Sequence, residues 1–226
     1  MSRHYKEARA LYEEIQPLAP DQVGKFLEAV MTLCPEHYEL FLTALHTGMR
    51  SGEIAALKWS DVDFAGKFFI VRANVSRSGK VGKTKTRKIR KIDMSDALHD
   101  ALLALKAHRT QEWEGKRLFL PEWIFANEAG NPPDMHNLKN RYFYRCLESA
   151  GLHRIRFHDL RHTYASILIG NGESLAYVKD QLGHSTIALT VNTYTHLIPG
   201  ANRQAVNRLP VYVPSAENVK ILKRQA

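Results

Sequence analysis

The sequence has little of what marks secreted, metal-binding or membrane proteins. It contains two cysteines among 226 residues, Cys34 and Cys146, and their spacing fits neither a metal site nor a redox pair. We expect both to be buried free thiols of a protein in a reducing compartment. No apolar run is long enough to span a membrane. Charged residues within the first ten positions interrupt the apolar stretch that a secretory signal would need.

Acidic residues are in the minority. Lys and Arg together number 32 against 23 for Asp and Glu, which gives a formal net charge of +9 and a pI near 9.6. Such a balance is typical of proteins that bind nucleic acid. The excess is concentrated in residues 77–91, which hold eight basic side chains and no acidic one. A solvated run of charge is the alternative interpretation, although the segment also alternates like a strand.

The spacing of hydrophobic residues, which make up 44% of the chain, predicts a mainly α-helical α+β fold with one core. Residues 61–94 change to a period of two, which predicts a small three-stranded antiparallel sheet with a long basic loop at 76–84. Apolar stripes predict helices over about 21–34, 36–47, 51–57, 95–105, 134–150, 160–170, 174–183 and 186–198.

Capping residues set the expected ends of these helices. Asp21 is expected to cap the first helix, with Phe26, Val30 and Met31 on its buried face. The other expected N-caps are Ser51, Ser95 and Ser174, and the expected helix stops are Gly48, Gly151 and Gly183.

Two arginines and a tyrosine have the chemistry to cleave a phosphodiester. Arg50 follows Gly48 on a tight turn, and His158 and Arg161 share one face at a helix start, where a phosphate is also favoured. Two guanidiniums would grip the non-bridging oxygens and stabilise a pentacoordinate transition state. Tyr194 would be the nucleophile, and a lysine from the basic loop would protonate the leaving 5′ oxygen.

Each of these residues alone has a simpler explanation. A single tyrosine on a helix is usually a core or surface aromatic, and a single arginine is usually a surface group. His158 and His162 are spaced like a metal-binding pair, but Asp159 stands where the zinc-protease motif has Glu, and Arg161 would place a positive charge beside a metal. The joint order of the residues favours phosphodiester chemistry, with no metal site.

Five motifs in order resemble the tyrosine recombinase (phage integrase) family, in particular its C-terminal catalytic domain. They are Thr-Gly-Met-Arg-Ser-Gly-Glu-Ile at 47–54, the Lys-Thr strand at 85–94, His-Asp-Leu-Arg-His-Thr-Tyr-Ala-Ser at 158–166, Gln-Leu-Gly-His-Ser at 181–185 and Thr-Val-Asn-Thr-Tyr-Thr-His-Leu-Ile-Pro-Gly at 190–200. The resemblance covers nearly the whole chain from about residue 18 and implies the fold of that catalytic domain.

The resemblance implies a role for each matching side chain. Arg50 and Arg161 would hold the scissile phosphate, and His158 would accept a proton and bind the phosphate. His184 would occupy the His/Trp position of the family and donate a hydrogen bond to a phosphate oxygen. Tyr194 would attack the phosphorus and form a 3′-phosphotyrosyl bond, so that neither ATP nor a metal nor another cofactor is required.

The resemblance also assigns supporting residues. Lys85 would be the general acid, since its distance to Ile92 fits the Lys-Thr strand register, and Lys83 is the alternative. Glu53 and Asp159 would orient Arg50 and the region of His158. The expected DNA-contacting residues of the basic loop are Arg77, Lys80, Lys83, Arg87 and Lys88.

The family comparison divides the chain into three expected segments. Residues 1–19 would be a linker or the remnant of an upstream domain, and 20–210 the catalytic domain. Residues 211–226 would form a C-terminal tail that docks onto a neighbouring protomer, with a helix folded back on its own domain as the alternative. Complete family members carry an upstream DNA-binding domain, so the chain would be the catalytic part of a longer integrase.

The function implied is site-specific DNA recombination in phage or mobile-element integration and excision. The alternatives are a DNA-relaxing topoisomerase of the same chemistry and a DNA-binding module without catalysis. The expected partners are double-stranded DNA and three further copies in a DNA-bound homo-tetramer, with weak or no association when free. Accessory DNA-bending proteins would assist, no membrane is involved, and the site of action would be DNA in the cytoplasm of a bacterial host.

Overall fold

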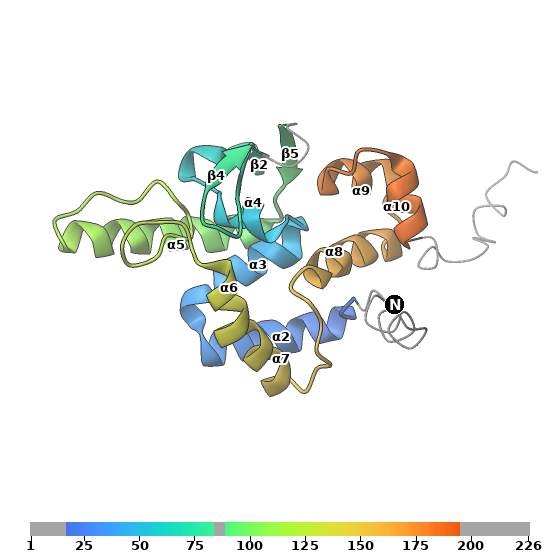
Figure 1. Cartoon of the computed structure of the whole chain (residues 1–226), viewed down its shortest axis with the longest axis horizontal. Helices are drawn as coiled ribbons and strands as arrows, with labels where there is room; N and C mark the ends of the chain where they lie inside the picture. Colours follow the sequence, from blue (N-terminus) through green and yellow to red (C-terminus); the bar gives the residue numbers. More distant parts are fainter. Residues whose placement is uncertain (1–16, 84–88, 195–226) are drawn as a thin grey trace, which may run out of the picture.

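A computed structural model describes residues 17–83 and 89–194 of the chain (Figure 1). The helices are α2 (Pro20–Leu33), α3 (Tyr38–Thr47), α4 (Ser51–Ala55), α5 (Asp96–Gly115), α6 (Met135–Leu138), α7 (Tyr144–Ser149), α8 (Asp159–Gly170), α9 (Leu175–Leu182) and α10 (Ile187–Tyr194). The strands are β1 (Val62–Asp63), β2 (Phe68–Val71), β3 (Ala73–Val75), β4 (Val81–Lys83) and β5 (Arg90–Asp93). The predicted fold class, mainly helical with a small antiparallel sheet, is confirmed.

The predicted three-stranded sheet has the order β1-β2-β5, with both pairs antiparallel. Phe69 pairs with Ile92 across β2 and β5, and both side chains are buried. The rest of the 61–94 segment forms a separate two-stranded ribbon, in which β3 pairs with β4. The turn of this ribbon, residues 76–80, belongs to the basic loop. This part of the loop therefore extends from the ribbon and not from the three-stranded sheet that contains β5.

Most of the predicted helix ends are confirmed. The hydroxyls of Ser95 and Ser174 accept hydrogen bonds from backbone nitrogens in the first turns of α5 and α9. Gly48 ends α3 and Gly183 ends α9, and both adopt the left-handed conformation, with φ of 59° and 67°. This conformation favours glycine because it has no Cβ.

Two expectations about α2 are wrong. The helix begins at Pro20, with Ala19 rather than Asp21 as its N-cap, because Gln22 accepts a hydrogen bond from the Ala19 nitrogen and proline suits the first helical position. Met31 is 52% exposed, since it lies one residue, or 100° of helical rotation, beyond the buried Val30. Ser51 likewise is the first residue of α4, and its N-cap is Arg50.

The buried side chains form two clusters. The larger one packs α2, α3 and α7 around aromatic rings such as Phe26, Phe41 and Phe143, whose centroids lie 5.5–6.0 Å apart. Cys34 and Cys146 are free, buried there and 3.5 Å apart. The smaller cluster belongs to α8, α9 and α10, which stand together at one side of the molecule (Figure 1). Among the helices described, none has the length and apolar character required to cross a membrane.

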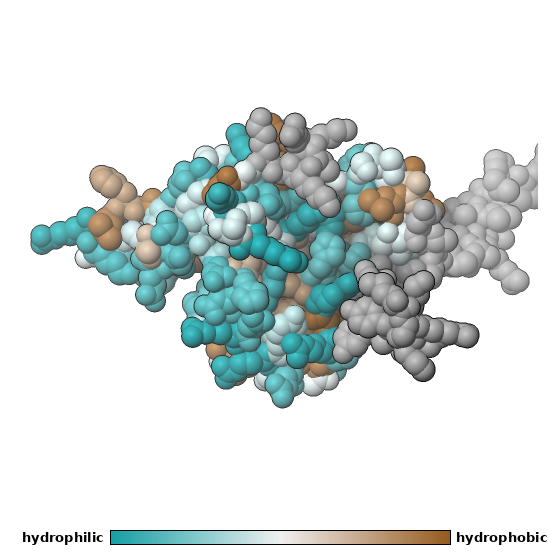
Figure 2. Space-filling view, in the orientation of Figure 1, coloured by the Kyte–Doolittle hydropathy of each residue, from teal (hydrophilic) through white to brown (hydrophobic). Residues whose placement is uncertain are grey.

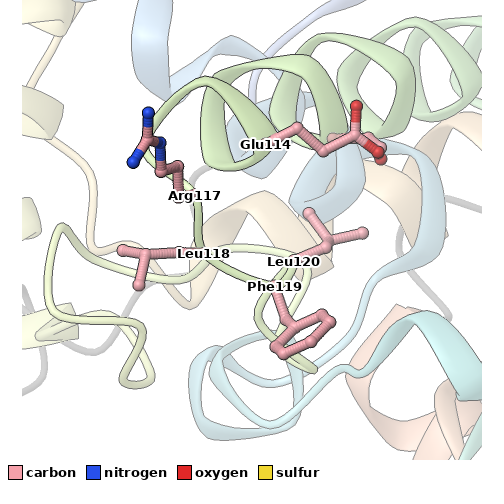
Figure 3. A pocket seen from close by; sticks show the side chains of 6 residues that line it. Glu114, Arg117, Leu118, Phe119 and Leu120 are labelled. Carbon is pink, nitrogen blue, oxygen red and sulfur yellow. The ribbon is translucent and has the colours of Figure 1, made fainter.

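Exposed apolar surface gathers at the far end of α5 (Figure 2). Leu118 and Phe119, which follow this helix, are 52% and 97% exposed. A cavity of about 410 Å³ opens beside them, lined also by Glu114 and Arg117 (Figure 3). The far end of α5 points away from α8, α9 and α10 (Figure 1), so this cavity is separate from those three helices.

Candidate active site

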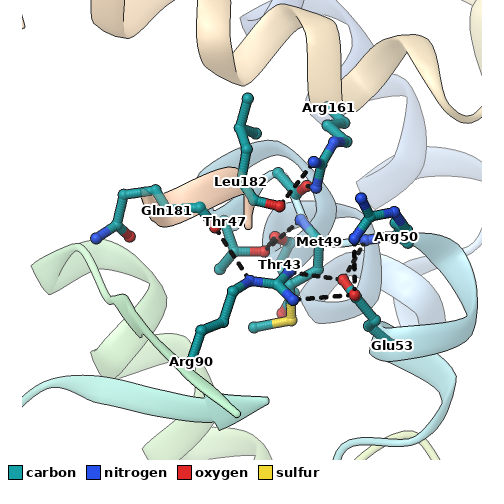
Figure 4. Close-up of polar contacts among 10 residues, drawn as sticks. Thr43, Thr47, Met49, Arg50, Glu53, Arg90, Arg161, Gln181 and Leu182 are labelled. Carbon is teal, nitrogen blue, oxygen red and sulfur yellow. Dashed lines mark hydrogen bonds and ion pairs between the residues drawn. The ribbon is translucent and has the colours of Figure 1, made fainter. Parts of the chain in front are cut away.

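Two arginines meet at the buried carboxylate of Glu53, in the first turn of α4 (Figure 4). Arg50 donates to it from its backbone nitrogen at 2.9 Å and from Nη1 at 3.0 Å. Arg90, at the start of β5, donates to the same two oxygens at 3.0 and 2.7 Å. Burial alone would raise the pKa of Glu53, but the hydrogen bonds and charge of Arg90, together with Arg50, outweigh it and hold the pKa below its ordinary value. Glu53 is therefore ionised at neutral pH and fixes both guanidiniums.

Arg161, in the first turn of α8, is 2% exposed and lies beside this pair. It donates from Nη1 to the carbonyl of Gly48 and from Nη2 to the carbonyl of Leu182, both at 2.7 Å (Figure 4). Each carbonyl belongs to the end of a helix where the chain turns. Burial and the charge of Arg50 lower the pKa of Arg161 to about 9, which leaves the guanidinium charged at neutral pH.

Arg50, Arg90 and Arg161, gathered around Glu53, form what we call the arginine cluster. In the part of the chain that the structure describes, Arg161 has carbonyl partners and no hydrogen bond to a carboxylate. A guanidinium has five N–H donors, so it retains hydrogens for an anion. The side chain of Arg50 is 28% exposed, which leaves the cluster open to a ligand from solvent. The arrangement fits a phosphate group.

Three histidines stand beside the arginine cluster. Desolvation and the charge of Arg161 lower the pKa of His158 and of His184 to about 4. Desolvation and the neighbouring His158 lower the pKa of His162 to the same value. Nδ1 of His184 lies 2.8 Å from the hydroxyl oxygen of Thr190, a residue of α10. This contact holds the His184 ring against α10. All three imidazoles are therefore neutral at pH 7 and able to accept protons or hydrogen bonds.

Tyr194, the last residue of α10, is fully buried against α8 and α9. Its hydroxyl oxygen lies 2.7 Å from Nδ1 of His162. Burial raises the pKa of Tyr194 to about 12. The rings of His158 and His162 meet edge to face, with centroids 5.1 Å apart. We call His158, His162, His184 and Tyr194 the histidine–tyrosine cluster.

Asp159 is buried at the start of α8 and holds the turn that contains His158. Its carboxylate accepts a hydrogen bond from the backbone nitrogen of Arg156 at 2.7 Å. It also forms an ion pair with the Arg156 guanidinium at 2.8 Å. His158 itself is exposed. Asp159 thus acts on the backbone that carries His158, and Glu53 acts directly on Arg50.

The basic loop is described only in part. Arg77 and Lys80 are exposed in the turn between β3 and β4. Lys83 ends β4, and its side chain, like all of Lys85, lies outside the described residues. The same holds for two further expected DNA-contacting residues, Arg87 and Lys88, and for the tail at 211–226.

The structure adds residues that the sequence interpretation did not single out. Arg90 was counted only as part of the basic run, and its pairing with Glu53 joins residues 37 positions apart. Lys139 donates from Nζ to the Ser51 hydroxyl at 3.3 Å and lies 5.0 Å from the Phe157 ring centroid. Burial and then the charge of Arg77 lower its pKa. Lys139 lies within the helical segment predicted at 134–150, and nothing local in the sequence distinguishes it.

A cavity of about 520 Å³ opens between β5 and α9 beside these clusters. Its lining is Ile89, Arg90, Lys91, Lys179, Asp180, Gly183, His184 and Ser185. Among residues 17–83 and 89–194, no group of three or more His, Cys, Asp or Glu side chains is placed to hold a metal ion. The site consists of fixed cations, neutral histidines and a tyrosine hydroxyl, which together can bind an anion and move a proton.

An anion site with an adjacent tyrosine hydroxyl, set in a helical fold with a small sheet, agrees with the resemblance found in the five motifs. Residues 16–199 match the phage integrase family. The chain belongs to this family, the tyrosine recombinases, and corresponds to its catalytic domain.

Individual relatives agree with this assignment. The chain is 32% identical over 214 residues to a tyrosine recombinase XerC-like protein of Caldanaerobacter subterraneus, covering 87% of this chain and 54% of that protein. The Tn1549 transposon integrase, in complex with transposon right end DNA, superposes with a TM-score of 0.73 at 25% identity, covering 87% of this chain and 67% of that one. The chain spans about half the length of the curated relatives it matches.

The catalytic domain of bacteriophage HP1 integrase shares the fold. It superposes with a TM-score of 0.59 at 22% identity, and the match covers 88% of this chain and 97% of that domain. The match therefore extends over nearly all of that domain.

Proposed function

We propose that this chain catalyses DNA strand cleavage and rejoining through a 3′-phosphotyrosyl intermediate on Tyr194, in the integration and excision of a phage or other mobile element. The observation that carries the proposal is the buried Arg161, held beside Arg50 without a carboxylate partner of its own among the described residues. Two adjacent guanidiniums repel each other until an anion lies between them, and a phosphodiester has the charge and the oxygens for that position.

The proposed reaction gives each group one step. Arg50 and Arg161 hold the non-bridging oxygens, His184 donates a hydrogen bond to one of them, and His158 contacts the phosphate from the start of α8. The hydroxyl of Tyr194 attacks the phosphorus, the P–O5′ bond breaks, and a lysine, Lys85 or its alternative Lys83, protonates the 5′ oxygen. Reversal by a different 5′ hydroxyl rejoins the strands, so no outside energy source is consumed.

The assembly and its surroundings are part of the proposal. Residues 20–210 act as the catalytic unit, 1–19 lead from an upstream segment, and 211–226 dock onto a neighbouring protomer in a homo-tetramer formed on double-stranded DNA. The free chain is monomeric or weakly associated, accessory proteins bend the DNA, and the work takes place on DNA in the bacterial cytoplasm. Relatives whose structures hold transposon DNA support DNA as the substrate.

The test is the relaxation of supercoiled plasmid at low salt, with detergent-stable protein–DNA adducts as a second readout. The native chain should do both, and Tyr194→Phe should bind DNA but do neither, because phenylalanine lacks the attacking oxygen. Tyr38→Phe is the matched control, since Tyr38 begins α3 at the end opposite to Gly48. Binding without adducts in the native chain would favour a DNA-binding module. Relaxation without exchange between two target sites would favour a topoisomerase.

A further inference from the structure

Among the described residues, the hydrogen-bond partner of the Tyr194 hydroxyl is His162, a residue to which no catalytic role is assigned above. Nδ1 of His162 lies 2.7 Å from the hydroxyl oxygen, and the ring centroids lie 5.6 Å apart. The two residues come from α8 and α10, which pack together in the smaller core cluster. His162 follows Arg161 directly, so one helix turn presents both a phosphate-binding cation and the partner of the nucleophile.

The surroundings fix the direction of this hydrogen bond. Burial raises the pKa of Tyr194 to about 12, so its hydroxyl remains protonated at neutral pH and needs an acceptor inside the protein. Desolvation and His158 lower the pKa of His162 to about 4, so its imidazole is neutral and has one unprotonated nitrogen. Since Nδ1 is the atom that faces the hydroxyl, we assign Tyr194 as the donor to Nδ1, with the ring hydrogen of His162 on Nε2.

His158 is placed differently. His158 is exposed, and its ring meets the ring of His162 edge to face, with centroids 5.1 Å apart. Among the residues described, the hydroxyl of Tyr194 bonds to His162 and has no hydrogen bond to His158. His158 is the N-cap residue of α8 and is exposed, whereas the next three residues of the helix are buried. We therefore assign the two histidines to different groups: His162 to the tyrosine hydroxyl and His158 to the phosphate.

We propose that His162 accepts the phenolic proton of Tyr194 as the tyrosine attacks the scissile phosphate, and that it holds the hydroxyl in position beforehand. This inference rests on the proposed function. The Oη–P bond forms, the P–O5′ bond breaks, the phenolic proton passes to Nδ1, and the general acid of the basic loop gives a proton to the 5′ oxygen. On rejoining, His162 returns its proton to the tyrosine oxygen.

The charges around His162 make this transfer depend on the substrate. The charged and titratable groups that face it are Arg156, His158, Asp159 and Arg161 on or before α8, Tyr194 on α10, and His184 after α9. Arg161 disfavours a proton on His162, and Asp159 favours one. A phosphodiester bound at Arg161 adds negative charge, so it increases the proton affinity of His162 at the moment when the tyrosine must release its proton.

The experiment measures single-turnover adduct formation on supercoiled plasmid by the full chain and two variants. His162→Ala removes the acceptor, and His162→Asn retains an oxygen that accepts a hydrogen bond but not a proton. We expect both to lose about 100-fold or more in rate, as general base catalysis contributes 10²–10⁴-fold. His153→Asn is the matched control, because His153 is exposed in the turn before α8.

The pH profile separates proton transfer from structural support. Between about pH 6 and 9 the native rate should change little, whereas the His162 variants should gain about tenfold per pH unit as hydroxide replaces the missing base. Fluorinated tyrosine at position 194, with a more acidic phenol, should restore the variants more than the native chain. Parallel profiles, restoration of the rate by asparagine, or variants within threefold of the native rate would overturn the inference. Failure of the native chain to form adducts would instead overturn the proposed function.

Discussion

The arginine cluster and the histidine–tyrosine cluster are neighbours with opposite physical characters. The guanidiniums of Arg50, Arg90 and Arg161 are charged and held by charge-assisted bonds to Glu53 and by two backbone carbonyls. The histidines and Tyr194 are neutral: His162 and Tyr194 share one hydrogen bond, His184 makes one to Thr190, and His158 contacts the ring of His162 edge to face. In the proposed function, the first cluster binds the charged phosphate and the second transfers a proton.

The arginine cluster influences the protonation of the histidine–tyrosine cluster. The charge of Arg161 lowers the pKa of all three histidines, second only to desolvation for His158 and His184. An empty site therefore keeps its proton acceptors unprotonated. A bound phosphate would offset the arginine charge and increase the proton affinity of the histidines. Under the proposed function, phosphate binding and proton transfer would be coupled through the charge of Arg161.

The largest effect is expected at Arg161. Arg161→Ala should reduce cleavage by at least about 1,000-fold, because it removes a fixed cation from the transition state. It should also lower the free energy of unfolding, since two buried carbonyls lose their donors at about 1–3 kcal/mol each. Arg161→Lys should remain severely impaired, because one ammonium cannot span both carbonyls and a phosphate. A lysine variant with native rates would contradict the fixed geometry of the arginine cluster.

Next in size is Glu53→Gln. The amide cannot hold two guanidiniums as a carboxylate does, so cleavage should fall by about 10–100-fold. Leaving Arg90 without its buried partner should cost about 3 kcal/mol of stability. Single-turnover rates and urea unfolding measure the two losses. Asp100→Asn, at an exposed position on α5, is the control for loss of one acidic charge.

An intermediate effect is expected from pH on stability. The folded-state pKa of His158, His162 and His184 is about 4, below the ordinary 6.5, so the unfolded chain binds more protons between these values. Their contribution to the free energy of unfolding is complete above pH 6.5 and is lost as the pH falls toward 4. The urea midpoint should therefore be lower at about pH 5 than at about pH 7.5, and His162→Asn should reduce that difference. An unchanged difference would show that folding does not lower the pKa of His162.

The smallest effect is expected from Lys139, which lies beside Ser51 at the edge of the arginine cluster. Lys139→Ala should weaken DNA binding a few-fold and reduce the slope of log K against log salt by about 0.9, as one phosphate contact is lost. Lys25→Ala, on the exposed face of α2, should leave the slope unchanged. An unchanged slope for Lys139→Ala would place it outside the DNA-binding surface.

Much of what depends on local chemistry could be predicted from the sequence, although the N-caps of α2 and α4 could not. Serine caps, left-handed glycines and the change of period at the sheet are local, so Ser95, Ser174, Gly48 and Gly183 were placed correctly. Contacts between distant segments gave no such signal. Arg90 bonds to Glu53 and His162 to Tyr194 only after folding brings them together. The burial of Val30 beside an exposed Met31 likewise depends on which side of α2 meets α3 and α7.

The most direct test of the central claim is to identify the DNA-linked residue and the linked DNA end. Adducts from the native chain are digested with protease and nuclease, and the nucleotide-bearing peptide is sequenced by mass spectrometry. We predict a 3′-phosphate joined to Tyr194, with a free 5′ hydroxyl on the opposite side of the cleaved bond. A link to another residue, or to a 5′ phosphate, would contradict the placement of Tyr194 beside His162 as the nucleophile and its base.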